Sequence, residues 1–191
     1  MPELIGYHSC AADGGEVHVL HNAPFLSRFD NSKPHKLPFL GEGRYLWDDD
    51  LDAAHWWGGV AHSGVYYVVK VHAPYNDGEL LDLCDREQLR MWVRLVERLE
   101  SKGHMARRIP AGMVFQVLRS LHLRHKSWNL FPWTIVRAVE TLPRGRAPRR
   151  FRHHSSSLSF LEQMPIWIFC LFSNYDITLL RKEVVHRPAT N

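Results

Sequence analysis

The segment 41–57, GEGRYLWDDDLDAAHWW, holds residue types suited to binding a flat heterocycle. Gly41 and Gly43 allow a ligand to approach the backbone closely, just before an expected strand that begins at Tyr45. Trp56 lies on the helix expected to follow. A stacked pair of rings contributes about 0.5–1.5 kcal/mol beyond area burial, so two aromatic residues could hold such a ligand between them. Packing of both side chains in the core is the alternative.

The spacing of these residues resembles a motif of the ADP-ribosyltransferase superfamily, on its poly-ADP-ribose polymerase and diphtheria-toxin side. Gly43-x-Tyr45 followed by Ala54-x-Trp56 is similar to the family's Gly-x-Tyr and Ala-x-Tyr pair. The two aromatic residues are eleven positions apart, as they are in the family. The resemblance implies that Tyr45 and Trp56 face the two sides of the nicotinamide ring of NAD⁺, beside Gly43.

A second motif of the same family stands near the start of the chain, at Gly6-Tyr7-His8-Ser9. It resembles the family's Tyr-His-Gly and His-Thr/Ser patterns. The resemblance implies that His8 holds a hydroxyl of the adenosine ribose, and that the backbone after it, at Ser9, binds the nicotinamide carboxamide. Ser9 replaces the usual glycine, which matters little where the backbone does the binding.

The third family residue is an acidic or amide side chain at the start of a late strand. Glu162 and Gln163 precede the apolar run 166–172. A carboxylate there can accept a hydrogen bond from the nicotinamide ribose and stabilise the oxocarbenium-like centre as nicotinamide leaves. It can also act as a general base, worth roughly 10²–10⁴-fold in rate. We favour Glu162 because a carboxylate does both. Gln163 is the alternative, and the solvated entrance of a strand is the other interpretation of both residues.

The resemblance implies one α+β domain over residues 1–191, with split antiparallel β-sheets and flanking helices. The resemblance also implies an enzyme that uses NAD⁺ and needs no metal. Asp52 and Ala53 stand where the polymerases carry Lys and Ser, which favours transfer of a single ADP-ribose over polymer synthesis. A small transferase of this type resembles a bacterial toxin or effector, which implies an antitoxin or immunity protein as partner. Three alternatives stay open: an NAD glycohydrolase, a catalytically inactive nucleotide- or RNA-binding relative, and an unrelated basic RNA-binding module.

Positive charge gathers late in the chain. The formal net charge is +4, yet residues 144–154 hold five arginines, two histidines and no acid. We expect residues 143–157 to form a mobile basic loop. Its arginines could bind the phosphates of an acceptor, while Trp128 and Trp133 stack on exposed bases. A charged loop beside a protein acceptor is the alternative, and we slightly favour nucleic acid. The arginines are Arg144, Arg146, Arg149, Arg150 and Arg152.

Cysteine and histidine usage favours neither a disulfide framework nor a metal site. Cys10, Cys84 and Cys170 are odd in number and far apart, which indicates a reducing, cytoplasmic setting. Histidine pairs at 122/125 and 153/154 have no cysteine pair to complete a tetrahedral zinc site. No apolar stretch approaches the eighteen or so residues of a membrane span, and no secretory signal is visible, so we expect no membrane association.

Hydrophobic periodicity predicts strands first, helices in the middle and strands last. The expected strands cover residues 4–10, 45–47, 65–71, 80–83, 166–172 and 177–185. The expected helices cover residues 51–57, 86–102, 110–122 and 131–142. Gly58-Gly59 is predicted to end the first of these helices, and residues 22–43 are predicted to form a long loop.

Overall fold

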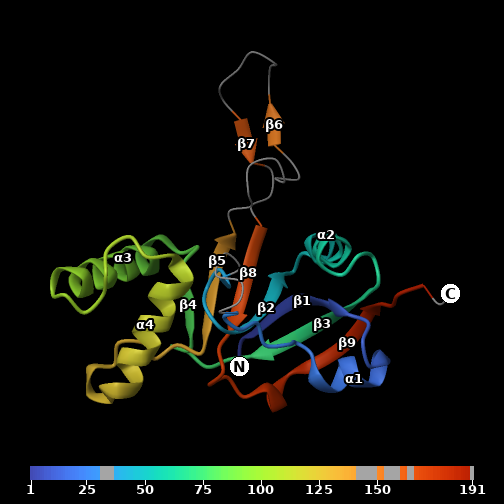
Figure 1. Ribbon diagram of the computed structural model, residues 1–191, viewed down its shortest axis with the longest axis horizontal. Helices are drawn as coiled ribbons and strands as arrows, with labels where there is room; N and C mark the ends of the chain where they lie inside the picture. The colour runs from blue at the N-terminus through green and yellow to red at the C-terminus, as the bar shows by residue number, and fades with distance from the viewer. Residues whose placement is uncertain (31–36, 141–149, 153–159, 163–165, 190–191) are drawn as a thin grey trace.

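The computed structural model describes residues 1–30, 37–140, 150–152, 160–162 and 166–189, with the backbone alone described at 150–152 and 160–162. These residues form an α+β fold (Figure 1). In chain order its elements are β1 (Glu3–Ala11), α1 (Gly15–Asn22), β2 (Arg44–Asp48), α2 (Leu51–Ala61), β3 (Tyr66–Pro74), β4 (Leu80–Asp82), α3 (Arg86–Ser101), α4 (Ala111–Arg124), the 3₁₀ turn η1 (Lys126–Trp128), β5 (Ile135–Glu140), β6 (Arg150–Arg152), β7 (Phe160–Glu162), β8 (Ile166–Leu171), the 3₁₀ turn η2 (Ile177–Leu179) and β9 (Arg181–His186).

Seven of the strands form one mixed sheet in the order β4-β5-β8-β2-β1-β3-β9, and β6 pairs with β7 separately. Strands β4 and β5 run parallel, whereas the other described neighbours are antiparallel. Several strands that are far apart in the sequence, such as β8 and β2 or β3 and β9, are therefore neighbours in the sheet, with β2 at its centre.

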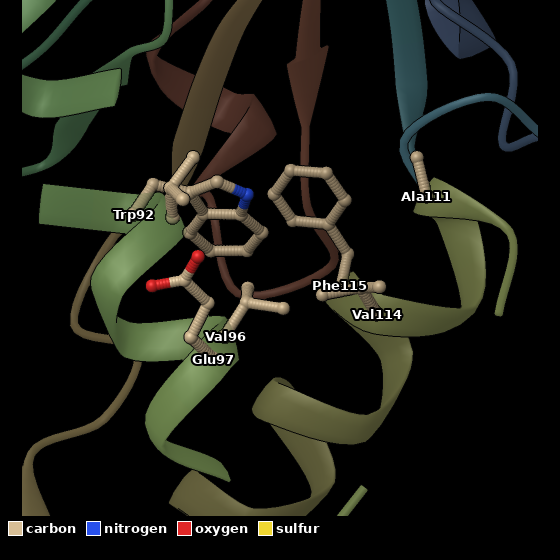
Figure 2. Close-up of a pocket in the computed structure, with 7 residues that line it drawn as sticks. Trp92, Val96, Glu97, Ala111, Val114 and Phe115 are labelled. Atoms are coloured by element: carbon tan, nitrogen blue, oxygen red, sulfur yellow. The ribbon is translucent and has the colours of Figure 1, made fainter. Parts of the chain in front are cut away.

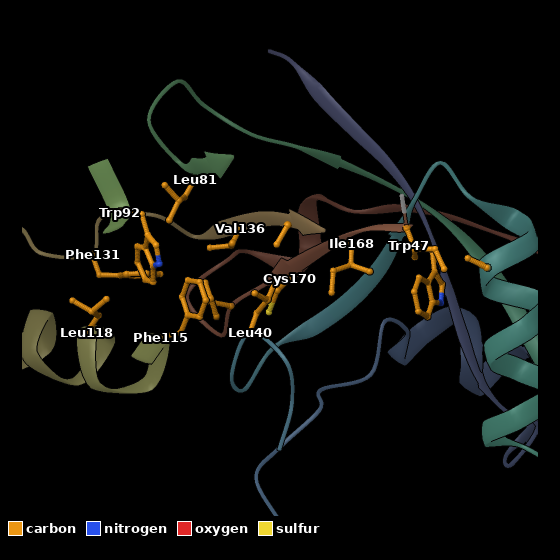
Figure 3. Packing of buried hydrophobic residues seen from close by; sticks show 14 of the residues in the cluster. Leu40, Trp47, Leu81, Trp92, Phe115, Leu118, Phe131, Val136, Ile168 and Cys170 are labelled. Atoms are coloured by element: carbon orange, nitrogen blue, oxygen red, sulfur yellow. The ribbon is translucent and has the colours of Figure 1, made fainter. Parts of the chain in front are cut away.

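Two hydrophobic clusters cover the two faces of this sheet. The first joins α2, α3 and α4 to the face that carries Trp47, Val136 and Ile168, which we call the three-helix face. Within it, Trp92 of α3 stacks on Phe115 of α4 with ring centroids 4.5 Å apart (Figure 2). These rings continue into the side chains of the central strands (Figure 3).

The second cluster covers the opposite face, which we call the α1 face. It includes Val19 of α1, Leu46 of β2 and Val69 of β3, together with Tyr175 and Leu180 from the segment that joins β8 to β9. The sheet is thus a central layer with three helices on one side and α1 on the other (Figure 1).

The strongest helix prediction, over residues 86–102, is confirmed by α3. The Asp85 carboxylate accepts hydrogen bonds from the amides of Glu87 and Gln88, which satisfies two of the unpaired amides at the helix start. The expected end of α2 at Gly58-Gly59 is wrong, because α2 continues to Ala61. Gly58 lies inside the helix, where a Cβ would stand 2.3 Å from the Tyr66 ring, so packing and not helix termination explains this glycine.

The prediction of a helix over residues 131–142 is also wrong, because the strand β5 lies there. Its residues alternate between the two faces: Val136 and Ala138 enter the three-helix cluster, and Ile135 enters the other. This period of two, together with β-branched residues, suits a strand buried between β4 and β8.

Smaller differences concern α1 and the last strand. Helix α1 was not predicted, and residues 177–185 contain η2 before β9 begins. Within residues 22–43, the described parts have no helix or strand beyond the end of α1, apart from a bridge between Ser27 and Gly43. The predicted basic loop at 143–157 lies outside the described residues except for β6.

Candidate functional site

The register of β1 on β2 decides which motif side chains can meet. It pairs Gly6 with Asp48 and Tyr7 with Trp47, and the same register continued would bring Ser9 opposite Tyr45 and His8 opposite Leu46. Neighbouring side chains of a strand point to opposite faces of its sheet. Tyr45 packs against the three-helix cluster, and Leu46 belongs to the cluster of the α1 face. The side chains of His8 and Tyr45 therefore lie on opposite faces, although their strands are neighbours.

His8 uses both ring nitrogens to bind backbone. Its Nδ1 donates to the carbonyl of Tyr45 at 3.0 Å, and its Nε2 accepts from the amide of Phe25 at 3.1 Å. This pair of bonds requires a neutral ring that carries its proton on Nδ1. Burial lowers the pKa of His8 to about 4, although the bond to the Tyr45 carbonyl opposes that change. His8 thus ties together β1, β2 and the segment after α1.

The Tyr45 hydroxyl anchors the loop that precedes β2. It accepts a hydrogen bond from the amide of Leu40 at 2.8 Å and donates to the carbonyl of Gly41 at 2.7 Å. Burial raises the pKa of Tyr45 far above its usual value, so the phenol stays protonated. Its ring lies against the three-helix cluster, on the same face as Trp56.

Trp56 belongs to a cluster of three rings, Trp47, Trp56 and Trp57, which we call the tryptophan cluster. The ring of Trp56 lies 6.4 Å from Trp47 and 6.1 Å from Trp57 between centroids. Trp47 is buried, whereas Trp57 is 40% exposed. Among the described ring pairs, Tyr45 and Trp56 are not in direct contact, although both pack against the same core cluster.

Helix α2 holds Trp56 near the strands through polar contacts at its start. The Asp50 carboxylate accepts from the amide of Ala53 at 2.8 Å and so caps the helix. The buried Ser9 hydroxyl donates to the carbonyl of Ala54, which ties β1 to the helix. The structure therefore brings Ser9, Tyr45 and Trp56 to one face.

Gly41 and Gly43 are required by packing. A Cβ on Gly43 would stand 2.2 Å from the Cys170 sulfur, so β2 could not approach β8 as it does. Gly41 has φ +87°, and a Cβ there would stand 3.0 Å from the carbonyl oxygen of Gly112 in α4. Both glycines thus serve close contacts within the protein.

The third predicted residue, Glu162, ends β7, where its backbone pairs with that of Arg150 in β6. Gln163 lies outside the described residues. Strand β8, which follows, pairs with β2 and sets Cys170 opposite Tyr45. Of the predicted acceptor-binding arginines, Arg150 and Arg152 lie in β6, and the other three, Arg144, Arg146 and Arg149, fall in a part of the chain that is not described.

A charged network on the α1 face was not predicted. Arg137 of β5 donates to Asp48 of β2 at 2.7 Å and to Asp82 of β4 at 3.2 Å, and its guanidinium lies 4.4 Å from the centroid of the Trp167 ring. Burial raises the pKa of Asp48, and its bond to Arg137 counteracts the change. The sequence shows Asp48 only as part of an acidic run, so nothing in it points to this partner.

Glu140, the last residue of β5, is a second residue that the sequence analysis missed. It is half-buried and lies on the three-helix side of its strand, as Val136 and Ala138 do. Burial raises the pKa of its carboxyl. The sequence predicted a helix over residues 131–142, so the side of the sheet on which Glu140 lies became clear only once β5 was seen to be a strand.

The pocket between α3 and α4 is separate from the Tyr45 region. Its volume is about 170 Å³, and Glu97 is the charged residue among its otherwise apolar lining (Figure 2). The other lining residues are Trp92, Val93, Val96, Ala111, Val114 and Phe115. A space of this size and polarity suits an apolar side chain better than a dinucleotide.

Known proteins give no further guide to the site: no family model, curated protein or solved structure matches the chain. In the described ranges, no helix is long and apolar enough to cross a membrane. The same residues contain no group of three or more His, Cys, Asp or Glu side chains that could hold a metal ion.

Proposed function

We propose that this protein is a mono-ADP-ribosyltransferase that uses NAD⁺ as its substrate. The observation that carries the proposal is the strand order β8-β2-β1, because it sets side by side the two strands that carry the first two motifs, and next to them the strand before which the third residue is expected. Strand β1 carries His8 and Ser9, β2 carries Tyr45, and Glu162, in β7 of the separate β6-β7 sheet, precedes β8 by four residues in the sequence.

The proposal extends to the fold. The α+β domain would be of the ADP-ribosyltransferase type, for which the resemblance implies split antiparallel sheets. The element order supports this assignment: a helix that carries Trp56 follows β2, then come β3, the short β4 and the long helix α3. In this chain, hydrogen bonding runs through all seven strands of the main sheet.

The nicotinamide ring would bind on the three-helix face, because Tyr45 and Trp56 both pack there and Ser9 lies on the same face. His8 projects to the other face and has both nitrogens bonded to backbone. We therefore assign His8 the role of a positioning residue that fixes β2, in place of the ribose contact that the motif implies.

The chemistry needs one carboxylate beside the ribose. The bond between ribose C1′ and the nicotinamide nitrogen breaks, nicotinamide leaves with the bonding electrons, and the acceptor bonds to C1′ and loses its proton. Glu162 would stabilise the positive charge that develops at C1′ and take the acceptor's proton. Gln163 could offer only a hydrogen bond to the ribose. With water as acceptor, the same residues would make an NAD glycohydrolase.

The test uses NAD⁺ labelled in its adenosine part. The purified chain is incubated with this NAD⁺ and a cell lysate, and the products are treated with nuclease or protease. We expect label on a macromolecule, and the treatment that removes it identifies a nucleic-acid or protein acceptor. Nicotinamide release without labelling indicates the glycohydrolase. With neither labelling nor release, the proposal fails.

Variants locate the site within the same assay. Tyr45→Ala and Glu162→Ala should abolish transfer, whereas Tyr45→Phe keeps the ring and should retain it. Trp56→Ala should lose activity, and the exposed neighbour in Trp57→Ala is the matched control that should not. If Glu162→Ala stays active and Gln163→Ala does not, the third residue is Gln163.

A toxin of this kind would also have an inhibitory protein partner, as the resemblance implies.

A further inference from the structure

Helix α3 carries a row of four arginines at intervals of four residues: Arg86, Arg90, Arg94 and Arg98. All four are exposed. Because an α-helix rises 1.5 Å per residue and turns once in 3.6 residues, successive arginines stand about 6 Å apart along the axis and about 40° apart around it. The row therefore extends over about 18 Å of one solvent-facing side of the helix.

Within the described part of the chain the arginine row makes no ion pair, although α3 also carries Glu87, Glu97 and Glu100. None of the four guanidiniums forms an ion pair or hydrogen bond with another described residue. Like charges four positions apart repel one another and destabilise an isolated helix. An anionic partner would remove this repulsion, so the row suits intermolecular contact better than it suits the stability of the helix.

The helical part of the chain carries an excess of positive charge, in addition to the basic run at residues 144–154. Residues 85–128 hold ten Lys and Arg against four Asp and Glu, whereas the rest of the chain holds fourteen against sixteen. The helical segment is thus positive, whereas the rest of the chain, taken together, is slightly negative even with the arginines of residues 144–154 included. A field of one sign on one side of a molecule attracts polyanions and orients their approach.

An exposed aromatic ring lies near the end of α3. Trp128 is 46% exposed and stacks on His125, with ring centroids 4.3 Å apart and planes 14° apart. Its ring also contacts His104, at 5.6 Å between centroids. The amide of His104 binds the carbonyl of Leu99 in the last turn of α3. Trp128 is therefore connected, through His104, to the C-terminal end of α3.

We propose that α3 and Trp128 form a binding surface for single-stranded nucleic acid. Arginine guanidiniums would bind the phosphates, and Trp128 would stack on an unpaired base. Trp92 and Leu99 of α3 are buried in the core and cannot enter a bilayer, whereas Leu89, Met91 and Val93 of the same helix are exposed, so the test includes anionic vesicles. The surface would hold a nucleic-acid acceptor for the transferase. That role rests on the proposed function, whereas the binding itself does not.

The experiment measures binding of a labelled single-stranded oligouridylate at several salt concentrations, without NAD⁺. The logarithm of the binding constant should fall linearly with the logarithm of salt concentration, by about 0.7 for each phosphate contact. Arg90→Ala/Arg94→Ala/Arg98→Ala should reduce this slope by about 2. Arg28→Ala removes an exposed arginine outside the helical segment and is the matched control that should leave the slope unchanged. Circular dichroism checks that the variants remain helical, which alanine favours.

A second variant separates stacking from charge. Trp128→Ala should weaken binding roughly tenfold without a change in the salt slope. The proposal is overturned if the oligonucleotide does not bind at low salt, if the triple variant keeps its slope, or if Trp128→Ala binds normally. Equal affinity for a duplex of the same length, or for anionic vesicles, also contradicts it. If the oligonucleotide binds as expected but the protein does not turn over NAD⁺, the proposed transferase activity fails and the binding surface stands.

Discussion

His8 connects two backbone groups, so its removal should act first on stability. In His8→Ala, the Phe25 amide and the Tyr45 carbonyl lose their partner, and each unpaired buried group costs about 1–3 kcal/mol. We expect the free energy of unfolding to fall by about 2–4 kcal/mol in urea denaturation. His21→Ala, at an exposed position of α1, is the control and should change stability by less than about 0.5 kcal/mol. Unchanged stability with lost NAD⁺ turnover would instead restore His8 to the ribose contact.

His8 also makes stability depend on pH. Its folded pKa of about 4 lies below the value of 6.5 expected when unfolded. Above pH 6.5 the ring is neutral in both states and its contribution is complete. As the pH falls toward 4, the unfolded chain takes up a proton that the folded protein does not, so stability decreases, by up to about 3 kcal/mol.

Urea denaturation between pH 4 and 7 measures this loss, and His8→Gln isolates it from the carboxylates that titrate in the same range. The difference in unfolding free energy between His8→Gln and the unchanged protein should shrink as the pH falls. A constant difference would mean that folding does not lower the pKa of His8.

At the scale of elements, two adjacent glycines of α2 should respond in opposite directions to alanine. In a helix interior, alanine is more favourable than glycine by about 1 kcal/mol. A Cβ at position 59 would have no atom within 4 Å. We therefore expect Gly59→Ala to stabilise the protein by about 0.5–1 kcal/mol. In Gly58→Ala, the Cβ would meet the Tyr66 ring at 2.3 Å. That ring is held by His55, which bonds its hydroxyl at 3.1 Å, and by the adjacent His186 ring.

Gly58→Ala should therefore lose about 1–3 kcal/mol through overpacking, despite the better helix propensity of alanine. Thermal unfolding followed by circular dichroism compares the two variants directly. If both raise the melting temperature, Tyr66 moves freely and the contact does not restrict α2.

Elements with a strong local signal were predictable from the sequence. The capping carboxylate of Asp85 and the regular apolar spacing of α3 are local features, and so is the β-branched run that became β3. Strand β5 was missed because its short apolar run has no turn signal that distinguishes a strand from a helix. The predicted end of α2 at Gly58 was wrong because the sequence does not distinguish a glycine that ends a helix from one that leaves room for a neighbouring side chain, here Tyr66.

The candidate site was less predictable than the elements. The sequence identified β1 and β2 as the strands that carry its motif residues, and these strands are neighbours. It could not show that Ser9, and not His8, shares a face with Tyr45, because a shift of one residue in strand register exchanges the faces. The partners of Arg137 were invisible for a related reason, since Asp48 and Asp82 meet it only through the strand order.

For the whole molecule, the strand order gives Arg137 a connecting role. Its ion pairs join β2 at the centre of the sheet to β4 at the edge, and α3 begins a few residues after β4. The positive helical segment is therefore attached to the sheet partly through a half-buried guanidinium. Loss of this group should loosen one side of the molecule and leave the opposite side, with β3 and β9, as it was.

Arg137→Leu tests this connection. It leaves the half-buried carboxylates of Asp48 and Asp82 without their cation, so we expect a loss of about 2–4 kcal/mol in the free energy of unfolding. Hydrogen exchange should accelerate in β4 and in the first turn of α3, but not in β3. Arg181→Ala is the control, since its pair with Glu3 is exposed and should contribute less than about 1 kcal/mol. Equal losses in the two variants, or faster exchange spread over the whole sheet, would mean that Arg137 adds only general stability. A local effect would show that the helical segment is held to the sheet through β4.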